Sequence, residues 1–127
     1  MSVMTAADYR AKVAAAMTEA QLLEQVRALA TALGWRIYHT HDSRRSPAGF
    51  PDLVMVRGGR LLFVELKATR GRYGPGQVEW LDDLTDVAAG SGDVVEALTW
   101  RPADLLDGTI EAILRGLPGN SQEHAER

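Results

Sequence analysis

The sequence predicts one mixed α/β domain whose helices and strands follow the order αβββαβα. Apolar residues recur at helical spacing after Thr18, and two apolar runs flank Gly58-Gly59 as in a β-hairpin. A further helix, strand and helix follow from Pro75 onward. With 127 residues, 46% of them hydrophobic, the chain is long enough to fold around a single core. A mixed β-sheet flanked by helices is therefore the expected architecture.

The boundaries of these elements follow from capping and turn residues. Thr18, with Gln21 three positions later, predicts the start of a helix, and Gly34 predicts its end. The other predicted elements are strands at 35–40, 52–57, 60–67 and 94–100, and helices at 75–90 and 103–115. We expect residues 1–17 to be a helical extension, residues 18–116 to be one domain, and residues 117–127 to be a polar, disordered tail.

Composition excludes several classes of protein. The chain has no cysteine, which excludes disulfides and thiolate-ligated zinc. No apolar run is long enough to span a membrane, and the N-terminus lacks the apolar segment of a signal peptide. We therefore expect a cytoplasmic protein with no membrane partner. The net charge of -3 is unevenly distributed, because residues 34–80 carry +4 and residues 81–127 carry -7. The basic middle segment indicates a polyanionic partner.

The central hairpin, FPDLVMVRGGRLLFVELKATR (residues 50–70), carries three charged residues near its open end. A two-residue turn fixes the register, so Asp52 is predicted to face Glu65. Side chains alternate between the faces of a strand, so Lys67 shares the face of Glu65. Directly opposed like charges are destabilising, and burial adds a desolvation cost. Such a pair requires a proton, the lysine or a bound cation.

A bound cation is the interpretation with chemical consequences. Two carboxylates at one corner suit Mg²⁺ or Mn²⁺, with the backbone carbonyl of Leu66 as a further ligand. At 100° per residue, Glu19 falls on the apolar stripe of its helix, whereas Glu24 falls on the solvent side. If this helix packs on the hairpin, Glu19 reaches the corner formed by the two carboxylates.

This arrangement is suited to phosphodiester hydrolysis. A carboxylate-held metal acidifies water and offsets charge in the transition state, and Lys67 positions the water or stabilises developing charge. Two basic loops would hold the phosphate backbone without reading sequence. Their arginines are Arg44, Arg45, Arg70 and Arg72.

The motifs themselves resemble those of known nucleases. Pro51-Asp52 followed by Glu65-Leu66-Lys67 resembles the PD-(D/E)xK motif of restriction-like nucleases. From about Thr18 to Trp100, the wider pattern resembles the VRR-NUC family: a glutamate-bearing helix, GFPDLV, a Gly-Gly hairpin, FVELK and GPGQVEWLDDL. The resemblance implies a restriction-endonuclease-like core and a Mg²⁺-dependent DNA endonuclease of the stand-alone type found in phages and bacteria.

The resemblance also implies roles for single residues. Asp52 and Glu65 would be metal ligands, Lys67 catalytic, Glu19 the acidic residue on the first helix, and Gln77 the glutamine near the site. Some relatives of this kind act on branched DNA such as Holliday junctions and act as homodimers. The alternative hypotheses are a non-catalytic nucleic-acid-binding module and a nuclease subunit that needs a partner chain.

Several of these residues also have plainer interpretations. Asp52 alone is compatible with a strand-start residue, and Glu65 with Lys67 alone is compatible with a charge pair at a sheet edge. The metal-site interpretation rests on their coincidence with Glu19. His39 and His41 lack the further ligands of a zinc site, which favours hydrogen-bonding or DNA-contacting roles. Trp80 and Trp100 are expected in the core, and Tyr73 is equally compatible with core packing and with base stacking.

Overall fold

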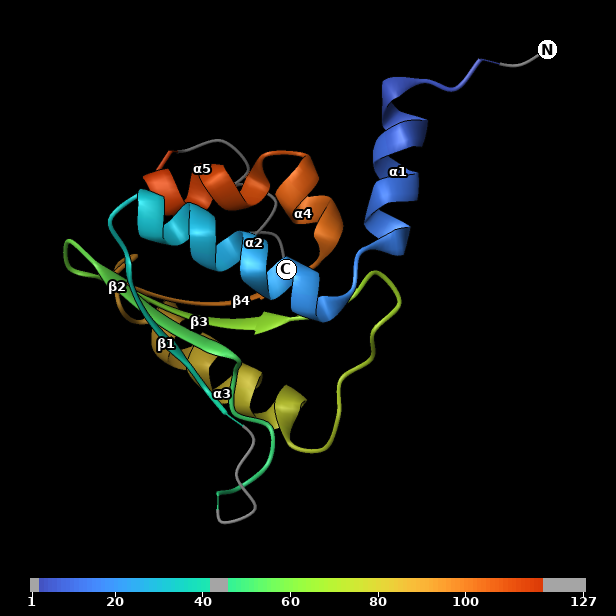
Figure 1. Ribbon diagram of the computed structural model, residues 1–127. Helices are drawn as coiled ribbons and strands as arrows, with labels where there is room; N and C mark the ends of the chain where they lie inside the picture. Colours follow the sequence, from blue (N-terminus) through green and yellow to red (C-terminus); the bar gives the residue numbers. More distant parts are fainter. Residues whose placement is uncertain (1–2, 42–45, 118–127) are drawn as a thin grey trace.

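A four-stranded mixed sheet carries helices on both faces in the computed structural model, which describes residues 3–41 and 46–117 (Figure 1). The elements in chain order are α1 (Ala6–Ala16), α2 (Glu19–Ala32), β1 (Arg36–His39), β2 (Leu53–Arg57), β3 (Arg60–Leu66), α3 (Gln77–Ala89), β4 (Val95–Trp100), α4 (Pro102–Leu106) and α5 (Thr109–Arg115). The predicted mixed α/β class is therefore confirmed. All but the first residue of the predicted tail, 117–127, lies outside the described residues.

The sheet has the strand order β1-β2-β3-β4, in which only the β3–β4 pair is parallel. The predicted hairpin register is confirmed, because Arg57 pairs with Arg60 and Val54 pairs with Phe63. Gly58 and Gly59 have φ angles of 53° and 81°, which a two-residue turn requires and which glycine adopts without strain. The turn residues therefore place the two strands in register without help from distant contacts.

The hydrophobic core lies between the sheet and the layer formed by α2, α4 and α5. Thr18 and Gln21 form the predicted capping box at the start of α2. The helix then buries Leu22, Val26 and Ala30 at helical spacing. They pack against the residues on one face of the sheet and against α5, namely Leu53, Met55, Leu62, Val64, Leu66, Leu98, Trp100, Ile110 and Leu114. Trp100 is a core residue, as predicted.

Helix α3 covers the opposite face of the sheet (Figure 1). None of its residues is fully buried. The contact is mediated by aromatic rings, because Phe50 packs edge-to-face against Phe63 of β3 at 6.0 Å and against Trp80 of α3 at 5.0 Å. Trp80 is thus half-buried at a layer boundary. The weak burial leaves the α3 face of the sheet available for polar residues.

Two expectations about helix boundaries are wrong. The single helix predicted at 103–115 is interrupted, because Gly108 has a φ angle of 86° and starts α5 as a new helix. Pro75 does not lie in the first turn of α3, which begins at Gln77 after Gly76. Both breaks occur at glycines with positive φ, and an apolar periodicity does not show where such a glycine interrupts a helix.

Helix α1 projects from the body of the molecule, and its start is capped by Thr5 (Figure 1). Only Ala14 of this helix is buried. Among residues 3–41 and 46–117, no helix combines the length and the apolar character that crossing a membrane requires.

Gly49, in the loop before β2, packs closely against Gly76 at the start of α3. Gly49 has a φ angle of 103° and Gly76 one of 79°. A Cβ atom on Gly49 would overlap the Gly76 carbonyl carbon and would come within 2.6 Å of the Gln77 nitrogen. A Cβ on Gly76 would overlap the Ala48 carbonyl oxygen. The two backbones therefore touch at a spacing that only glycine permits.

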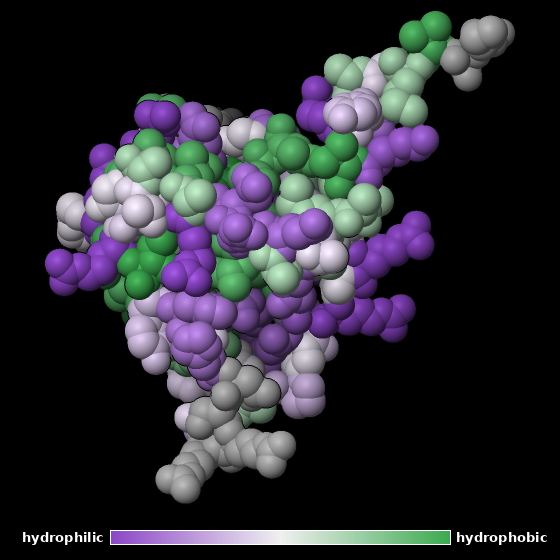
Figure 2. Space-filling view, in the orientation of Figure 1, coloured by the Kyte–Doolittle hydropathy of each residue, from purple (hydrophilic) through white to green (hydrophobic). Residues whose placement is uncertain are grey.

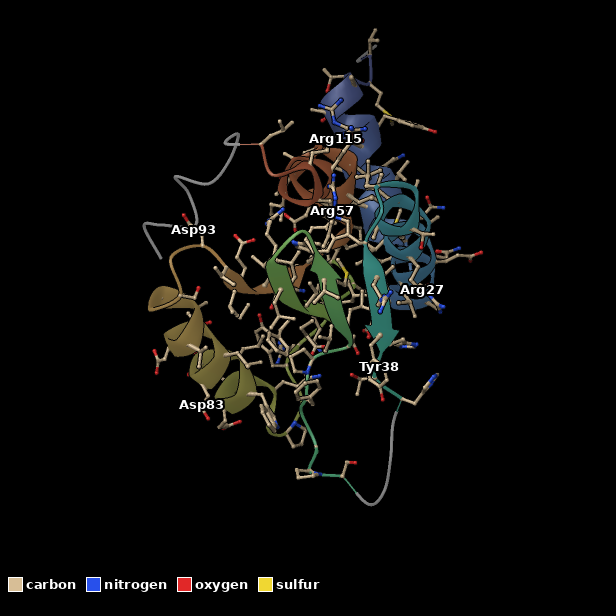
Figure 3. The ribbon with its side chains drawn as sticks, turned by 90° about the vertical axis from the view of Figure 1, so that its left-hand side faces the viewer. Arg27, Tyr38, Arg57, Asp83, Asp93 and Arg115 are labelled. Carbon is tan, nitrogen blue, oxygen red and sulfur yellow. The ribbon has the colours of Figure 1, made fainter. Side chains whose placement is uncertain are left out.

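The hairpin end of the sheet is tied to α5 by basic residues. Arg57, labelled in Figure 3, donates to the Leu114 carbonyl at 3.0 Å. Arg60 donates to the Ile113 carbonyl at 2.8 Å. Arg60 also pairs with Glu96 at 2.9 Å. These interactions satisfy carbonyls at the C-terminus of a helix, where positive charge is favourable. Two of the basic residues in the middle segment therefore have structural partners.

Candidate active site

A row of polar side chains crosses the sheet at the open end of the hairpin. Continuing the β2–β3 register by one residue places Asp52 opposite Glu65. The parallel register pairs Glu65 with Thr99. On the other side, the Thr40 nitrogen donates to the Asp52 carbonyl at 2.8 Å, which continues the β1–β2 register. Thr40, Asp52, Glu65 and Thr99 therefore lie side by side on the α3 face.

Backbone hydrogen bonds fix the corner around Asp52. The Leu66 nitrogen donates to Asp52 Oδ2 at 2.8 Å, which binds the carboxylate to the end of β3. The Lys67 nitrogen donates to the Trp100 carbonyl at 3.0 Å, so the strand pairing extends to the lysine. The motif residues thus lie in β3 or directly beside the ends of β2 and β3, where hydrogen bonds to neighbouring strands hold them.

Glu65 is the most deeply buried charged residue described, with 1% of its surface exposed. Burial, followed by the adjacent Asp52 carboxyl group, raises the pKa of Glu65 to about 9. The charge of Lys67 acts in the opposite direction. Two ionised carboxylates can only accept hydrogen bonds. In the absence of a cation, the pair therefore holds a proton, as expected for opposed acids.

Unsatisfied polar atoms concentrate in this row. Within the described residues, the buried side-chain atoms without a hydrogen-bond partner are Thr40 Oγ1, both carboxylate oxygens of Glu65 and Trp100 Nε1. Three of these four atoms lie beside Asp52. Because buried polar groups are nearly always paired, these atoms are available to a bound group at this end of the sheet.

The available ligand set is small. In the part of the chain that the structure describes, no three His, Asp or Glu side chains gather closely enough to hold a metal ion together. A cation at this corner would therefore use Asp52, Glu65, the Leu66 carbonyl and water. That set fits Mg²⁺, which keeps several waters and often binds through one or two carboxylates.

Glu19 is exposed, although its helical position falls on the apolar stripe of α2. Its side chain is exposed at the first residue of α2, so the expectation that it faces the core is wrong. The first turn of α2 extends beyond the core residues, which begin at Leu22. Helix α2 starts near the carboxyl end of β3 (Figure 1). After burial and Asp52, the charge of Glu19 is a further cause that raises the pKa of Glu65. Glu19 is thus within electrostatic range of the corner.

Lys67 is 7% exposed and lies beside an aromatic ring. Its Nζ is 5.8 Å from the centroid of the Tyr73 ring, within the range of a cation–π interaction. The Tyr73 hydroxyl is 2.7 Å from Thr99 Oγ1. The ion pairs of the described residues join Arg60 to Glu96 and Arg115 to Glu111, so none holds Lys67.

Arg101 fastens the loop that follows Lys67. Its Nη1 donates to the carbonyls of Ala68, Thr69 and Gly71 at 2.8, 3.4 and 2.9 Å. The Thr69 hydroxyl donates to the Ala14 carbonyl at the end of α1, at 2.9 Å. The loop is therefore held from two sides by groups far away in the sequence.

Replacing Arg101 with methionine should loosen this loop. We expect the loss of charge-assisted hydrogen bonds to lower the free energy of unfolding by about 1.5–3 kcal/mol. Hydrogen exchange should accelerate across residues 68–74. The matched control is Arg115→Met, which removes an exposed pair with Glu111 and should cost no more than about 0.5 kcal/mol. Equal unfolding curves for the two variants would show that Arg101 does not stabilise the loop at residues 68–74.

The other residues named from the sequence have contacts or exposure of their own. Gln77 starts α3, and its Oε1 accepts from the Gly74 nitrogen at 2.6 Å, so its recorded contact is with its own loop. Arg70 and Arg72 are exposed on the loop after β3. Hydrophilic side chains project from the molecule where this loop runs (Figure 2). Arg44 and Arg45 lie outside the described residues. The rings of His39 and His41 have centroids 4.8 Å apart and are tilted by 53°.

Three contributors to the site were not predicted from the sequence. Thr40 was assigned only to a strand, Thr99 to another strand, and Arg101 to no role. The signal for Thr40 was available, because the register that places Asp52 opposite Glu65 also extends across β1. No local signal points to Arg101, since its partners lie 30 or more residues earlier.

Comparison with known proteins gives a match at the level of a family. A family model described as the VRR-NUC domain matches residues 6–97. No curated protein and no solved structure matches the chain.

Proposed function

Because the chain belongs to the VRR-NUC domain family, we propose that it is a metal-dependent DNA endonuclease acting at the Asp52–Glu65–Lys67 corner. The family has a restriction-endonuclease-like fold and a nuclease-type domain, which implies that the substrate is nucleic acid. The observation that carries the finer proposal is the buried carboxylate of Glu65, whose oxygens both lack a partner within the described residues. A divalent cation beside Asp52 would satisfy them.

The residues of the corner would hold Mg²⁺ or Mn²⁺ through Asp52, Glu65 and the Leu66 carbonyl, with Glu19 as an outer carboxylate. The bound metal would polarise the scissile phosphate and acidify a water molecule. The Leu66 nitrogen keeps Asp52 directed to the corner through Oδ2. Lys67, buried on the same face as Glu65, would donate a hydrogen bond to a phosphate oxygen or to the attacking water.

The charged surface supports one path for DNA. Arg70 and Arg72 are exposed on the loop directly after Lys67, where they would contact phosphates. The outer face of α3 is acidic, with Asp83 directed away from the sheet (Figure 3). Its exposed acids are Glu79, Asp82, Asp83 and Asp86. The phosphate backbone would therefore pass along the loop and not across α3. Arg44 and Arg45 remain proposed phosphate contacts.

We further propose that the enzyme prefers branched DNA, such as a four-way junction, and acts as a homodimer. A small domain has one carboxylate corner, whereas a junction presents related cleavage points on two strands. A twofold-symmetric pair of domains would place one corner on each strand.

The test is cleavage of a labelled panel: four-way junction, flap, nicked duplex, linear duplex and supercoiled duplex. We expect cutting with Mg²⁺ or Mn²⁺ and none in EDTA. Asp52→Asn should lower the rate by at least about 100-fold, since it removes a metal ligand, while DNA binding is retained. Asp83→Asn is the matched control on the exposed face of α3 and should cut at the wild-type rate.

The same panel defines failure. Cleavage that persists in EDTA, or that survives unchanged in Asp52→Asn, would contradict a metal site at this corner. Binding without cleavage under every metal condition would favour the non-catalytic module, and cleavage that requires an added protein would favour a partner-dependent subunit.

A further inference from the structure

We propose that Tyr73 is a positioning residue that fixes the Lys67 amino group beside Glu65. The proposal rests on the function proposed above only for its catalytic consequence. The placement itself stands on the contacts of the Lys67 and Tyr73 side chains. Tyr73 belongs to the loop between β3 and α3, and the sequence did not distinguish core packing from base stacking for it.

To hold one position, the Lys67 amino group needs a partner. A lysine side chain has four rotatable bonds and binds as a point charge. Within the described residues, no Asp or Glu side chain forms an ion pair with Lys67. The ring of Tyr73, 5.8 Å from Nζ, is the contact recorded for this amino group. The face of an aromatic ring attracts an ammonium group electrostatically. The N–H groups of the lysine then remain available to a phosphate or a water.

The tyrosine ring is itself anchored at its far end. The Tyr73 hydroxyl and Thr99 Oγ1 are 2.7 Å apart, a short hydrogen bond. Thr99 is the direct neighbour of Glu65 in the parallel register. The chain of contacts therefore runs from Lys67 through the ring of Tyr73 to Thr99, and across the strand pair back to Glu65.

The backbone on both sides of Tyr73 is held as well. Before it, Arg101 binds the carbonyls of Ala68, Thr69 and Gly71. After it, the Gly74 nitrogen donates to Gln77 Oε1 at 2.6 Å. A ring used for stacking on DNA bases would need a free face and freedom to turn. Tyr73 keeps 42% of its surface exposed, but its hydroxyl and one face of its ring are already engaged, so the ring is not free to turn.

The first arm of the test measures placement without cleavage. The chain contains two lysines, Lys12 on α1 and Lys67. Protein with ¹³C-labelled lysine therefore gives two ε-methylene signals, and exposed Lys12 is an internal reference. Ring currents should shift the Lys67 signal upfield of the Lys12 signal in the metal-free wild type. Tyr73→Leu should move it to the Lys12 position. The control, Tyr38→Leu on β1, where the side chain is exposed, should leave both lysine signals unchanged.

The second arm measures the rate. Tyr73→Leu should lower kcat about 10-fold with little change in KM, because a misplaced group costs transition-state stabilisation and not DNA binding. Tyr73→Phe keeps the ring but loses the hydrogen bond to Thr99, so its effect should be smaller. Thr99→Val removes the same bond from the other side. The double variant should therefore resemble either single variant, since the two changes act on one interaction.

Each arm can overturn the proposal. A Lys67 signal that coincides with that of Lys12 in the wild type, or that ignores Tyr73→Leu, would show that the ring does not fix the lysine. A raised KM with unchanged kcat would assign Tyr73 to DNA stacking instead. If the wild type cuts no DNA, the proposed function fails, while the lysine signals still decide the placement.

Discussion

Replacing Glu65 with glutamine should abolish cleavage and, at the same time, stabilise the metal-free protein at pH 8. Glutamine keeps the volume of glutamate and can donate a hydrogen bond to Asp52, but it carries no charge. It therefore relieves the buried pair of opposed carboxylates and removes a metal ligand. We expect a loss of cleavage of at least about 1,000-fold, which corresponds to several kcal/mol of transition-state stabilisation.

The stability effect has a defined dependence on pH. The pKa of Glu65 is raised from 4.5 to about 9 on folding, because of burial and then Asp52. Between these values the unfolded state has released a proton that the folded state still holds, so the free energy of unfolding falls as the pH rises. Below pH 4.5 the contribution is constant. Glu65→Gln should therefore gain on the order of 2 kcal/mol at pH 8 and little at pH 5.

Urea denaturation in EDTA at both pH values measures this difference. Glu24→Gln is the matched control, because Glu24 is exposed on the same helix as Glu19 and away from the corner. Added Mg²⁺ should raise the stability of the wild type and of the control but not of Glu65→Gln, since only a bound ligand shifts the unfolding equilibrium. An equal gain at pH 5 and pH 8 would contradict the assignment of the effect to a buried charge.

Replacing Gly49 with alanine should destabilise the protein strongly and disable the site from a distance. The added Cβ would overlap the Gly76 backbone and approach the Gln77 nitrogen to 2.6 Å, at a φ angle of 103° that alanine disfavours. The combined strain and overpacking should cost about 2–5 kcal/mol. The loop from Gly49 leads directly to Phe50, Pro51 and Asp52, so any shift that relieves the overlap moves the carboxylate.

Gly92→Ala provides the matched control for this change. Gly92 also has a positive φ angle, 64°, but nothing lies within 4 Å of a Cβ added there. It should cost only about 1–2 kcal/mol, the penalty of the backbone conformation alone. Urea denaturation and cleavage rates separate the two variants. Equal destabilisation would mean that the contact between Gly49 and Gly76 is not a tight backbone packing.

The carboxylate corner itself was largely determined by the sequence, because its geometry is local. A two-residue turn at Gly58-Gly59 sets the register of the strands on either side, and the register alone places Asp52 against Glu65. The alternation of side chains along β3 then places Lys67 on the same face. These relations depend on turn length and strand period, both of which are visible in the residues from 50 to 70. The α2 cap and its buried stripe were predictable for the same reason.

The surroundings of the corner were decided only by the tertiary structure. Thr99 reaches Glu65 through a parallel pairing whose register depends on the whole crossover through α3. Arg101 holds carbonyls about 30 residues earlier, and Gly49 meets Gly76 across two loops. Helical periodicity placed Glu19 on the apolar stripe, but its side chain is exposed. Periodicity shows which side of a helix faces the core, and not where along its length the helix extends beyond the core. Local periodicity thus fixed which residues share a face, whereas long-range packing fixed which faces meet.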